Sequence, residues 1–146
     1  MIDNNYFQCS LSNEQYRRLK NKLNAFMVDN FNGQLKFSCC RILPIITLTE
    51  DEKKIVRNAV DKRRYEFSAG RRCARKCLDH SYITDFSLIK GKYGEPVWPQ
   101  GFTGSITHRF VLAFAVTLPQ DQEDIGIDFV DLSEQLSGTH LVLSFL

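Results

Sequence analysis

The chain has 146 residues, 43% of them hydrophobic and 12% aromatic, and a formal net charge of +2, values that predict one compact domain rather than a disordered chain. No apolar run approaches the ~20 residues needed to span a bilayer, and the segment MIDNNYFQCS lacks the basic start and apolar core of a signal peptide. We therefore expect a cytoplasmic protein with no membrane span.

The first predicted elements are a helix and a strand. Residues 11–31 space their apolar side chains as a helix does, with a start near Ser12. Residues 35–48 are rich in Ile, Phe, Cys and Leu, and they predict a strand that is interrupted or edged at Pro44. Thr49 then predicts a helix cap, because acidic residues fill the first turn after it.

One long helix is predicted from this cap to about residue 78. Its apolar positions keep helical spacing and leave the arginines on another face; they are Val56, Val60, Phe67, Gly70, Ala74, Cys77 and Leu78. A glycine in a helix interior costs about 1 kcal/mol relative to alanine, so Gly70 indicates close contact with a neighbouring element or a ligand.

The remaining chain has β-like patterns. We expect strands at residues 87–89, 104–107, 111–118 and 125–130, with turns at 92–94, 108–110 and 119–124. Consecutive strands with short links favour an antiparallel meander. The predicted fold class is therefore α+β, with a long helix packed on a mostly antiparallel sheet.

The five cysteines form no recognisable disulfide framework, so we expect reduced thiols and no disulfide. Cys39 and Cys40 are adjacent on the predicted strand and should face opposite ways. Cys73, Cys77 and His80 share one helix face and could place three ligands on zinc, but no fourth ligand is evident. We favour buried thiols that pack against the sheet.

The charge is distributed unevenly along the chain. Residues 51–92 carry twelve Lys and Arg against six Asp and Glu, whereas residues 93–146 carry one basic residue against seven acidic ones. Arg64, Arg71 and Arg75 fall on one helix face and could grip a ligand with several phosphates. A solvated helix surface is the alternative. Nucleic-acid binding ranks lower, because no aromatic residues interleave with the basic ones.

Two residues of the β-like region are further candidates. His108 ends a predicted strand in a Gly/Ser/Thr-rich context, where an imidazole can reach a phosphate oxygen. Asp128 ends the apolar run Ile-Gly-Ile, and a carboxylate at the edge of a core needs a cationic or hydrogen-bonding partner. Magnesium commonly uses one or two carboxylates together with substrate phosphates and water, so Asp128 could serve as its ligand.

Several motifs in this order resemble those of the 4'-phosphopantetheinyl transferases, and in particular the type represented by enterobactin synthase component D. Residues 63–74 read RRYEFSAGRRCA and resemble the family's arginine-rich helix. They are followed by the turn GEPVWP at 94–99, the strand GSITH at 104–108 and the strand GID at 126–128. The resemblance covers about residues 62–128.

The resemblance implies that coenzyme A donates its phosphopantetheine arm to a serine of an apo acyl, peptidyl or aryl carrier protein in siderophore synthesis. Arg63 and Arg71 would hold the 3'-phosphate end of coenzyme A, and His108 would contact its phosphates together with the strand from Ser105 to Thr107. Asp128 would be a ligand of Mg²⁺. Association with a siderophore synthetase complex is also implied, whereas nucleic acid is not an expected partner.

The sequence departs from the family pattern at three places. Val130 stands where the second carboxylate is usual, with Asp131 one residue further, and Arg109 stands where a small residue or cysteine is usual. The motif whose glutamate is implicated in activating the carrier serine is absent, so no catalytic residue is assigned. We expect a first half-domain at 1–120 and the opening of a truncated second half at 121–146, where HLVLSFL has no continuation to bury it. The alternative is a coenzyme A-binding half-domain without catalysis.

Overall fold

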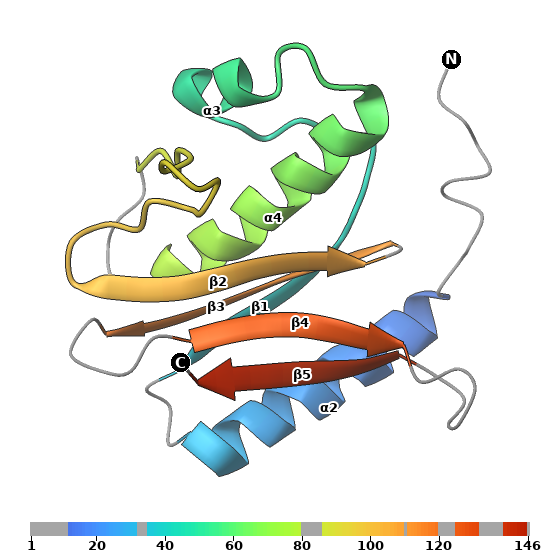
Figure 1. Cartoon of the computed structure of the whole chain (residues 1–146). Helices are drawn as coiled ribbons and strands as arrows, with labels where there is room; N and C mark the ends of the chain where they lie inside the picture. Colours follow the sequence, from blue (N-terminus) through green and yellow to red (C-terminus); the bar gives the residue numbers. More distant parts are fainter. Residues whose placement is uncertain are drawn as a thin grey trace.

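The computed structural model describes residues 12–31, 35–79, 86–109, 111–119, 125–131 and 139–145. In chain order the elements are α2 (Asn13–Phe31), β1 (Lys36–Arg41), α3 (Glu50–Ile55), α4 (Asp61–Asp79), β2 (Phe102–Arg109), β3 (Leu112–Pro119), β4 (Ile125–Asp131) and β5 (Thr139–Phe145) (Figure 1). The predicted α+β class is confirmed. No helix in these ranges is long and apolar enough to cross a membrane.

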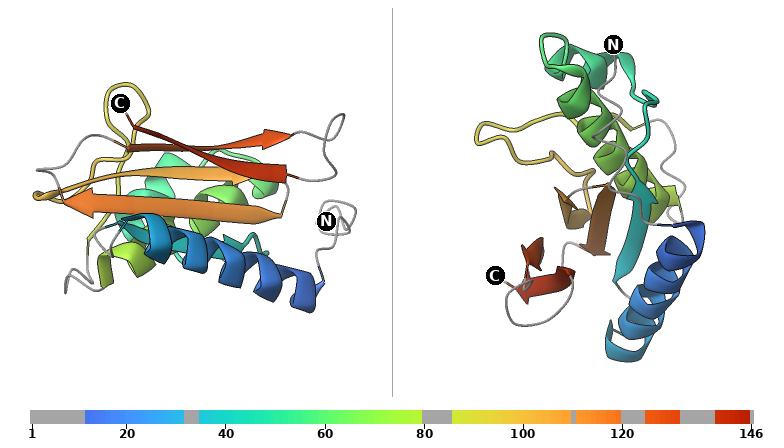
Figure 2. Two further views of the ribbon diagram at one scale, coloured as in Figure 1. Left: turned by 90° about the horizontal axis from the view of Figure 1, so that it is seen from below. Right: turned by 90° about the vertical axis from the view of Figure 1, so that its right-hand side faces the viewer.

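The strands form two antiparallel sheets. The larger has the order β1-β3-β2, and the smaller pairs β4 with β5. The β4–β5 hairpin lies next to β2, on the side of the larger sheet away from α4 (Figure 2). The predicted links between consecutive strands hold for β2–β3, but β1 joins the far edge of β3, so β3 is the central strand.

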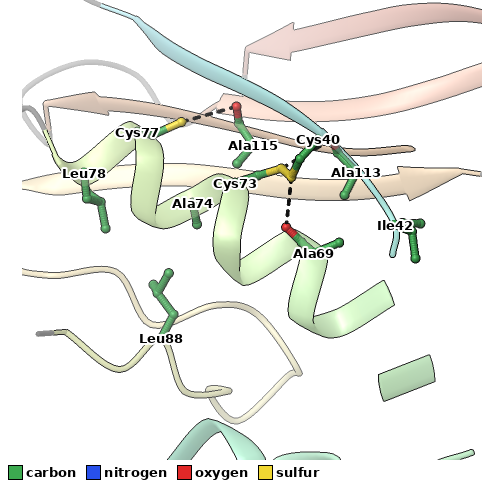
Figure 3. Close-up of a cluster of buried hydrophobic side chains, with 10 residues drawn as sticks. All are labelled: Cys40, Ile42, Ala69, Cys73, Ala74, Cys77, Leu78, Leu88, Ala113 and Ala115. Atoms are coloured by element: carbon green, nitrogen blue, oxygen red, sulfur yellow. Dashed lines mark hydrogen bonds between the residues drawn. A yellow bond between two sulfur atoms is a disulfide. The ribbon is translucent and has the colours of Figure 1, made fainter. Parts of the chain in front are cut away.

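Alternate residues of β3 build two separate cores, because successive side chains of a strand point to opposite faces. On one face Phe114 and Val116 pack with residues of β1 and α2. On the other face Ala113 and Ala115 leave room for α4, whose small buried residues approach the sheet closely (Figure 3). Cys39 belongs to the first core and Cys40 to the second, as their adjacent positions predicted.

The N-terminal helix begins with reciprocal bonds between Ser12 and Gln15. The Gln15 amide donates to Ser12 Oγ at 3.1 Å, and the Ser12 amide donates to Gln15 Oε1 at 2.9 Å. This capping box satisfies amides that the first turn leaves without partners. The predicted helix at 11–31 is confirmed to within two residues at its start.

The prediction of one long helix after Thr49 is wrong, because the chain turns between α3 and α4. Thr49 is the N-cap of α3, with a capping box to Glu52 as expected, but that helix ends at Ile55. Val56 is buried, whereas Val60 is 73% exposed, so the two do not share one apolar face. Asn58 and Asp61 favour helix ends over helix interiors, and the ion pair of the buried Glu52 with Arg75 joins α3 to α4 across the turn.

One strand prediction also needs correction. Residues 87–89 form no strand, because the backbone N–H and C=O of Leu88 bond to side chains of Glu52 and Arg71 instead of a neighbouring strand. The turn at 92–94 is confirmed, with Gly94 at φ 83°. Residues 140–145, which belong to the apolar run expected to have no continuation to bury it, form part of β5, which pairs along its length with β4.

The expectation of reduced cysteines is wrong for one pair. A disulfide links Cys40 on β1 to Cys73 on α4, 33 residues apart in sequence (Figure 3). The contact depends on how α4 packs on the sheet, which no sequence spacing reveals. Cys39 and Cys77 are free and buried, and burial raises the pKa of each thiol to about 12. His80 lies outside the described residues.

Candidate functional site

Two glycines position β2 against its neighbours. A Cβ at Gly70 would lie 2.8 Å from Cγ2 of Ile106, so this glycine lets α4 approach β2 closely. The predicted close contact at Gly70 is confirmed, and the neighbour is a strand of the protein. A Cβ at Gly104 would lie 2.7 Å from Cζ2 of Trp98 and 2.5 Å from the Val116 carbonyl oxygen. The GEPVWP turn and the GSITH strand are thus packed directly together.

His108 lies at the end of β2 beside the first half of α4. Its Nε2 is 3.7 Å from Oε2 of Glu66, whose Oε1 lies 3.9 Å from Nζ of Lys62. Burial lowers the pKa of His108, Arg63 and Lys62 lower it further, and Glu66 acts in the opposite direction. The His108 side chain is still 37% exposed. An imidazole placed among two cations and a carboxylate can therefore meet an anionic ligand from solvent.

Arg63 and Arg71 lie on either side of Phe67, on successive turns of α4. Cζ of Arg63 is 5.8 Å from the Phe67 ring centroid, and Cζ of Arg71 is 4.1 Å from it. Arg71 is only 6% exposed, and its Nε donates to the Leu88 carbonyl oxygen at 2.9 Å. Burial lowers the pKa of Arg71 to about 10.

The predicted row of arginines does not form one continuous cationic face. Arg75 pairs with the buried carboxylate of Glu52, and Arg64 lies 3.8 Å from Asp61. Ser68, between them on the helix, is fully buried and its Oγ accepts from the Thr47 amide at 2.8 Å. Ser68 and Arg75 thus pack against the segment around α3, whereas the Arg64 side chain is 42% exposed, so the arginines of this face have different environments.

The structure places Ser105 and Thr107 on the face of β2 opposite to His108. Ile106 contacts the core beneath α4, whereas Ser105 and Thr107 pair directly with Val116 and Phe114 of the other core. Their side chains and that of His108 therefore do not converge on one point. The backbone of the strand is the part that both faces share.

Arg109 is the last residue of β2 and lies one position after His108, on the opposite face by alternation. It therefore does not crowd the side of the strand on which His108 meets α4.

Asp128 lies in the middle of β4, paired with Val142 of β5. The strand continues to Asp131, so Asp128 and Asp131, three residues apart, occupy positions on opposite faces of the ladder. In the described ranges, no group of three His, Cys, Asp or Glu side chains is placed to hold a metal ion.

Sequence reasoning missed two acidic residues of this region. Glu66 was part of a quoted motif, yet its proximity to His108 depends on the packing of α4 on β2. Glu52 was interpreted only as a first-turn acid, although it is completely buried and holds α3 to α4.

Comparison with known proteins agrees with the motifs. Residues 51–118 match the model of the 4'-phosphopantetheinyl transferase N-terminal domain. This match supports the phosphopantetheinyl transferase family. The matched segment contains α4, β2 and all but one residue each of α3 and β3, and therefore Arg63, Arg71 and His108.

Three curated phosphopantetheinyl transferases are similar to the chain. The 4'-phosphopantetheinyl transferase PptT of Mycobacterium tuberculosis is 38% identical over 86 residues, which cover 58% of this chain and 38% of that protein. Svp of Streptomyces mobaraensis is 37% identical over 86 residues, covering 58% of the chain and 35% of Svp. Npt of Nocardia iowensis is 37% identical over 78 residues, covering 53% and 35%. The chain thus spans less than two fifths of each relative's length.

Proposed function

We propose that this chain binds coenzyme A and takes part in the transfer of its 4'-phosphopantetheine group to a serine of an apo carrier protein. The observation that carries the proposal is the placement of Arg63 and Arg71 about Phe67 on α4, with His108 of β2 close enough to the same helix to feel the charge of Arg63, all within the segment that matches the transferase N-terminal domain. In this reaction the serine oxygen bonds to the phosphorus that bears the pantetheine arm. The bond to the adenosine side breaks, the serine proton passes to a base, and adenosine 3',5'-bisphosphate leaves.

The chemistry of the three side chains suits the donor. Guanidinium groups bind phosphate through paired, charge-assisted hydrogen bonds, and Arg63 and Arg71 would hold the 3'-phosphate end. His108 would contact the pyrophosphate, where an anion would favour the charged imidazole that burial now disfavours. Ser105 and Thr107, on the opposite face of β2, would contribute through the backbone of that strand.

Magnesium is proposed as the metal, with Asp128 as the protein ligand. When bound, the ion would neutralise charge on the pyrophosphate. The position of Asp128 on β4, the strand that lies next to β2, supports this assignment.

The activity is tested by incubating the purified chain with an apo carrier protein, coenzyme A and Mg²⁺ and weighing the carrier. We expect the carrier to gain the mass of one phosphopantetheine, and the Arg71→Ala, His108→Ala double variant to lose this gain. Arg57→Ala removes an exposed arginine of the same region and serves as the matched control. No gain with the unaltered chain would refute catalysis by this chain.

A second candidate function is coenzyme A binding without catalysis, in a half-domain at residues 1–120 followed by the opening of a second half at 121–146. The match of residues 51–118 to the N-terminal domain of the transferases favours this candidate. It predicts that coenzyme A binds by calorimetry and that the double variant loses this binding, while the carrier's mass stays unchanged.

We further propose a carrier of siderophore synthesis as the acceptor, on the resemblance of the motifs to the enterobactin synthase component D type. Offering an aryl carrier domain from a siderophore synthetase and an acyl carrier protein of fatty acid synthesis in competition would test this choice. Preferential modification of the fatty acid carrier would contradict it.

A further inference from the structure

Glu52 is a completely buried carboxylate that bonds to the cap of its own helix, to α4 and to the segment around Leu88. Its Oε1 accepts from the Thr49 amide at 3.0 Å and pairs with Arg75 of α4. Its Oε2 accepts from the backbone amide of Leu88 at 2.8 Å. A buried charge is costly unless it is paired and hydrogen-bonded, and here both oxygens are used.

The Leu88 peptide connects this carboxylate to Arg71. Leu88 has no exposed surface and lies in a segment without regular secondary structure, so its direction is set by side-chain bonds rather than by a sheet. Its amide donates to Glu52, and its carbonyl oxygen accepts from Arg71 Nε at 2.9 Å. A second bond, between the hydroxyls of Thr49 and Ser87 at 2.7 Å, fixes the preceding residue to the start of α3.

Arg71 is held in place through its Nε. Within the described part of the chain, no carboxylate forms an ion pair with Arg71. Phe67 packs against the flat guanidinium at 4.1 Å. A nearly buried guanidinium that is fixed at Nε and packed against a ring has a set direction, which a planar, two-point contact with an anion requires.

We propose that Glu52 is a positioning residue for the donor phosphate: it holds the Leu88 peptide, and the Leu88 carbonyl orients Arg71. The inference rests on the proposed function, because it takes the 3'-phosphate of coenzyme A as the anion that Arg71 binds. Glu52 itself does not touch the ligand. It acts on the direction of the Arg71 guanidinium through the Leu88 peptide group.

A change from Glu52 to Gln isolates this link. The carboxylate accepts on both oxygens, whereas an amide accepts on one and donates from the other side. If the amide oxygen keeps Thr49 and Arg75, its NH₂ group faces the N–H of Leu88, donor against donor. The Leu88 peptide then loses its anchor, and the Arg71 guanidinium loses its fixed direction, while α3 stays joined to α4.

The test compares two probes by calorimetry with the full chain: adenosine 3',5'-bisphosphate and adenosine 5'-monophosphate. Their Kd ratio reports the 3'-phosphate contact alone. We expect Arg71→Gln to abolish the preference for the bisphosphate, and Glu52→Gln to reduce it about fivefold to tenfold, the size of one ordinary hydrogen bond, because Arg71 loses its fixed direction but keeps its charge. Monophosphate binding should stay within about twofold, and adding Glu52→Gln to Arg71→Gln should change the ratio no further. Asp51→Asn makes the same change at an exposed site of α3 and should have no effect.

Each outcome decides the proposal. An unchanged ratio in Glu52→Gln, with the preference lost in Arg71→Gln, overturns the positioning role and leaves the proposed function intact. Equal weakening of both probes overturns it too, because it indicates a general loss of structure. If the unaltered chain shows no preference, the assignment of Arg71 to the 3'-phosphate fails, and the inference with it. Should Glu52→Gln not fold by circular dichroism, Ser87→Ala decides: a smaller loss of preference supports the proposal and an unchanged ratio overturns it.

Discussion

Replacing Gly70 by alanine tests the closest approach between α4 and β2. The new Cβ would lie 2.8 Å from Cγ2 of Ile106, whereas ordinary carbon–carbon contacts lie at about 3.5–4.0 Å. Ile106 is β-branched, so its Cγ2 cannot rotate away without leaving its preferred rotamer. Neither the helix backbone nor the Ile106 side chain can move away without strain. The loss of stability from the steric clash should therefore lie toward the upper part of the ~1–3 kcal/mol range for overpacking.

The helix itself gains from the same change. Alanine is about 1 kcal/mol better than glycine in a helix interior, so the expected net loss is about 1–2 kcal/mol. For a chain of this size that corresponds to a fall of about 3–6 °C in Tm. Thermal unfolding followed by circular dichroism measures it.

A double-mutant cycle with Ile106→Ala identifies the cause. If the two side chains collide, Gly70→Ala should cost less in the Ile106→Ala background than in the unaltered chain. A rise in Tm for Gly70→Ala, or strict additivity in the cycle, would refute the packing argument.

Two further predictions concern the disulfide and His108. The Cys40–Cys73 bond closes a loop of 33 residues, so its reduction should lower the free energy of unfolding by about 3–4 kcal/mol. The Cys40→Ala, Cys73→Ala variant is the control, and its stability should not respond to reductant. Equal urea midpoints for the oxidised and the reduced chain would contradict this prediction. Burial lowers the pKa of His108 below its ordinary 6.5, so the folded state favours the neutral imidazole. The stability that neutral His108 contributes is therefore present above pH 6.5, and it is lost as the pH falls through the folded-state pKa. Tm measured from pH 7.5 to 5 should therefore fall slightly less in His108→Asn than in the unaltered chain, and identical slopes would be inconsistent with the shift.

Local signals in the sequence predicted the elements whose contacts are local. The cap at Thr49 depends on residues within one turn, and the strand from Leu112 depends on a continuous apolar run, so both were recognised. Gly70 was interpreted correctly because a glycine weakens a helix interior unless a close neighbour needs the space of the missing side chain. In these cases the sequence within a few residues carries the signal.

The errors arose where distant segments decide the structure. The break after α3 and the irregular segment around Leu88 both follow from Glu52, which was assigned to the helix dipole because its partners lie 23 and 36 residues away. The pairing of Cys40 with Cys73 likewise needs the helix to be packed on the sheet. At the candidate site, Arg63, Arg71 and His108 were selected by motif, but the burial of Arg71 was visible only in three dimensions.

The position of β3 has a consequence for the order in which the chain can fold during synthesis. β3 is the central strand of its sheet, yet α2, β1, α3, α4 and β2 all precede it in sequence. Synthesis proceeds from the N-terminus, so the apolar faces of both long helices have no sheet to cover them until residue 119 has left the ribosome. Until then β1 and β2 lack the strand that joins them. The nascent chain therefore exposes the most apolar surface to a chaperone before β3 has been synthesised.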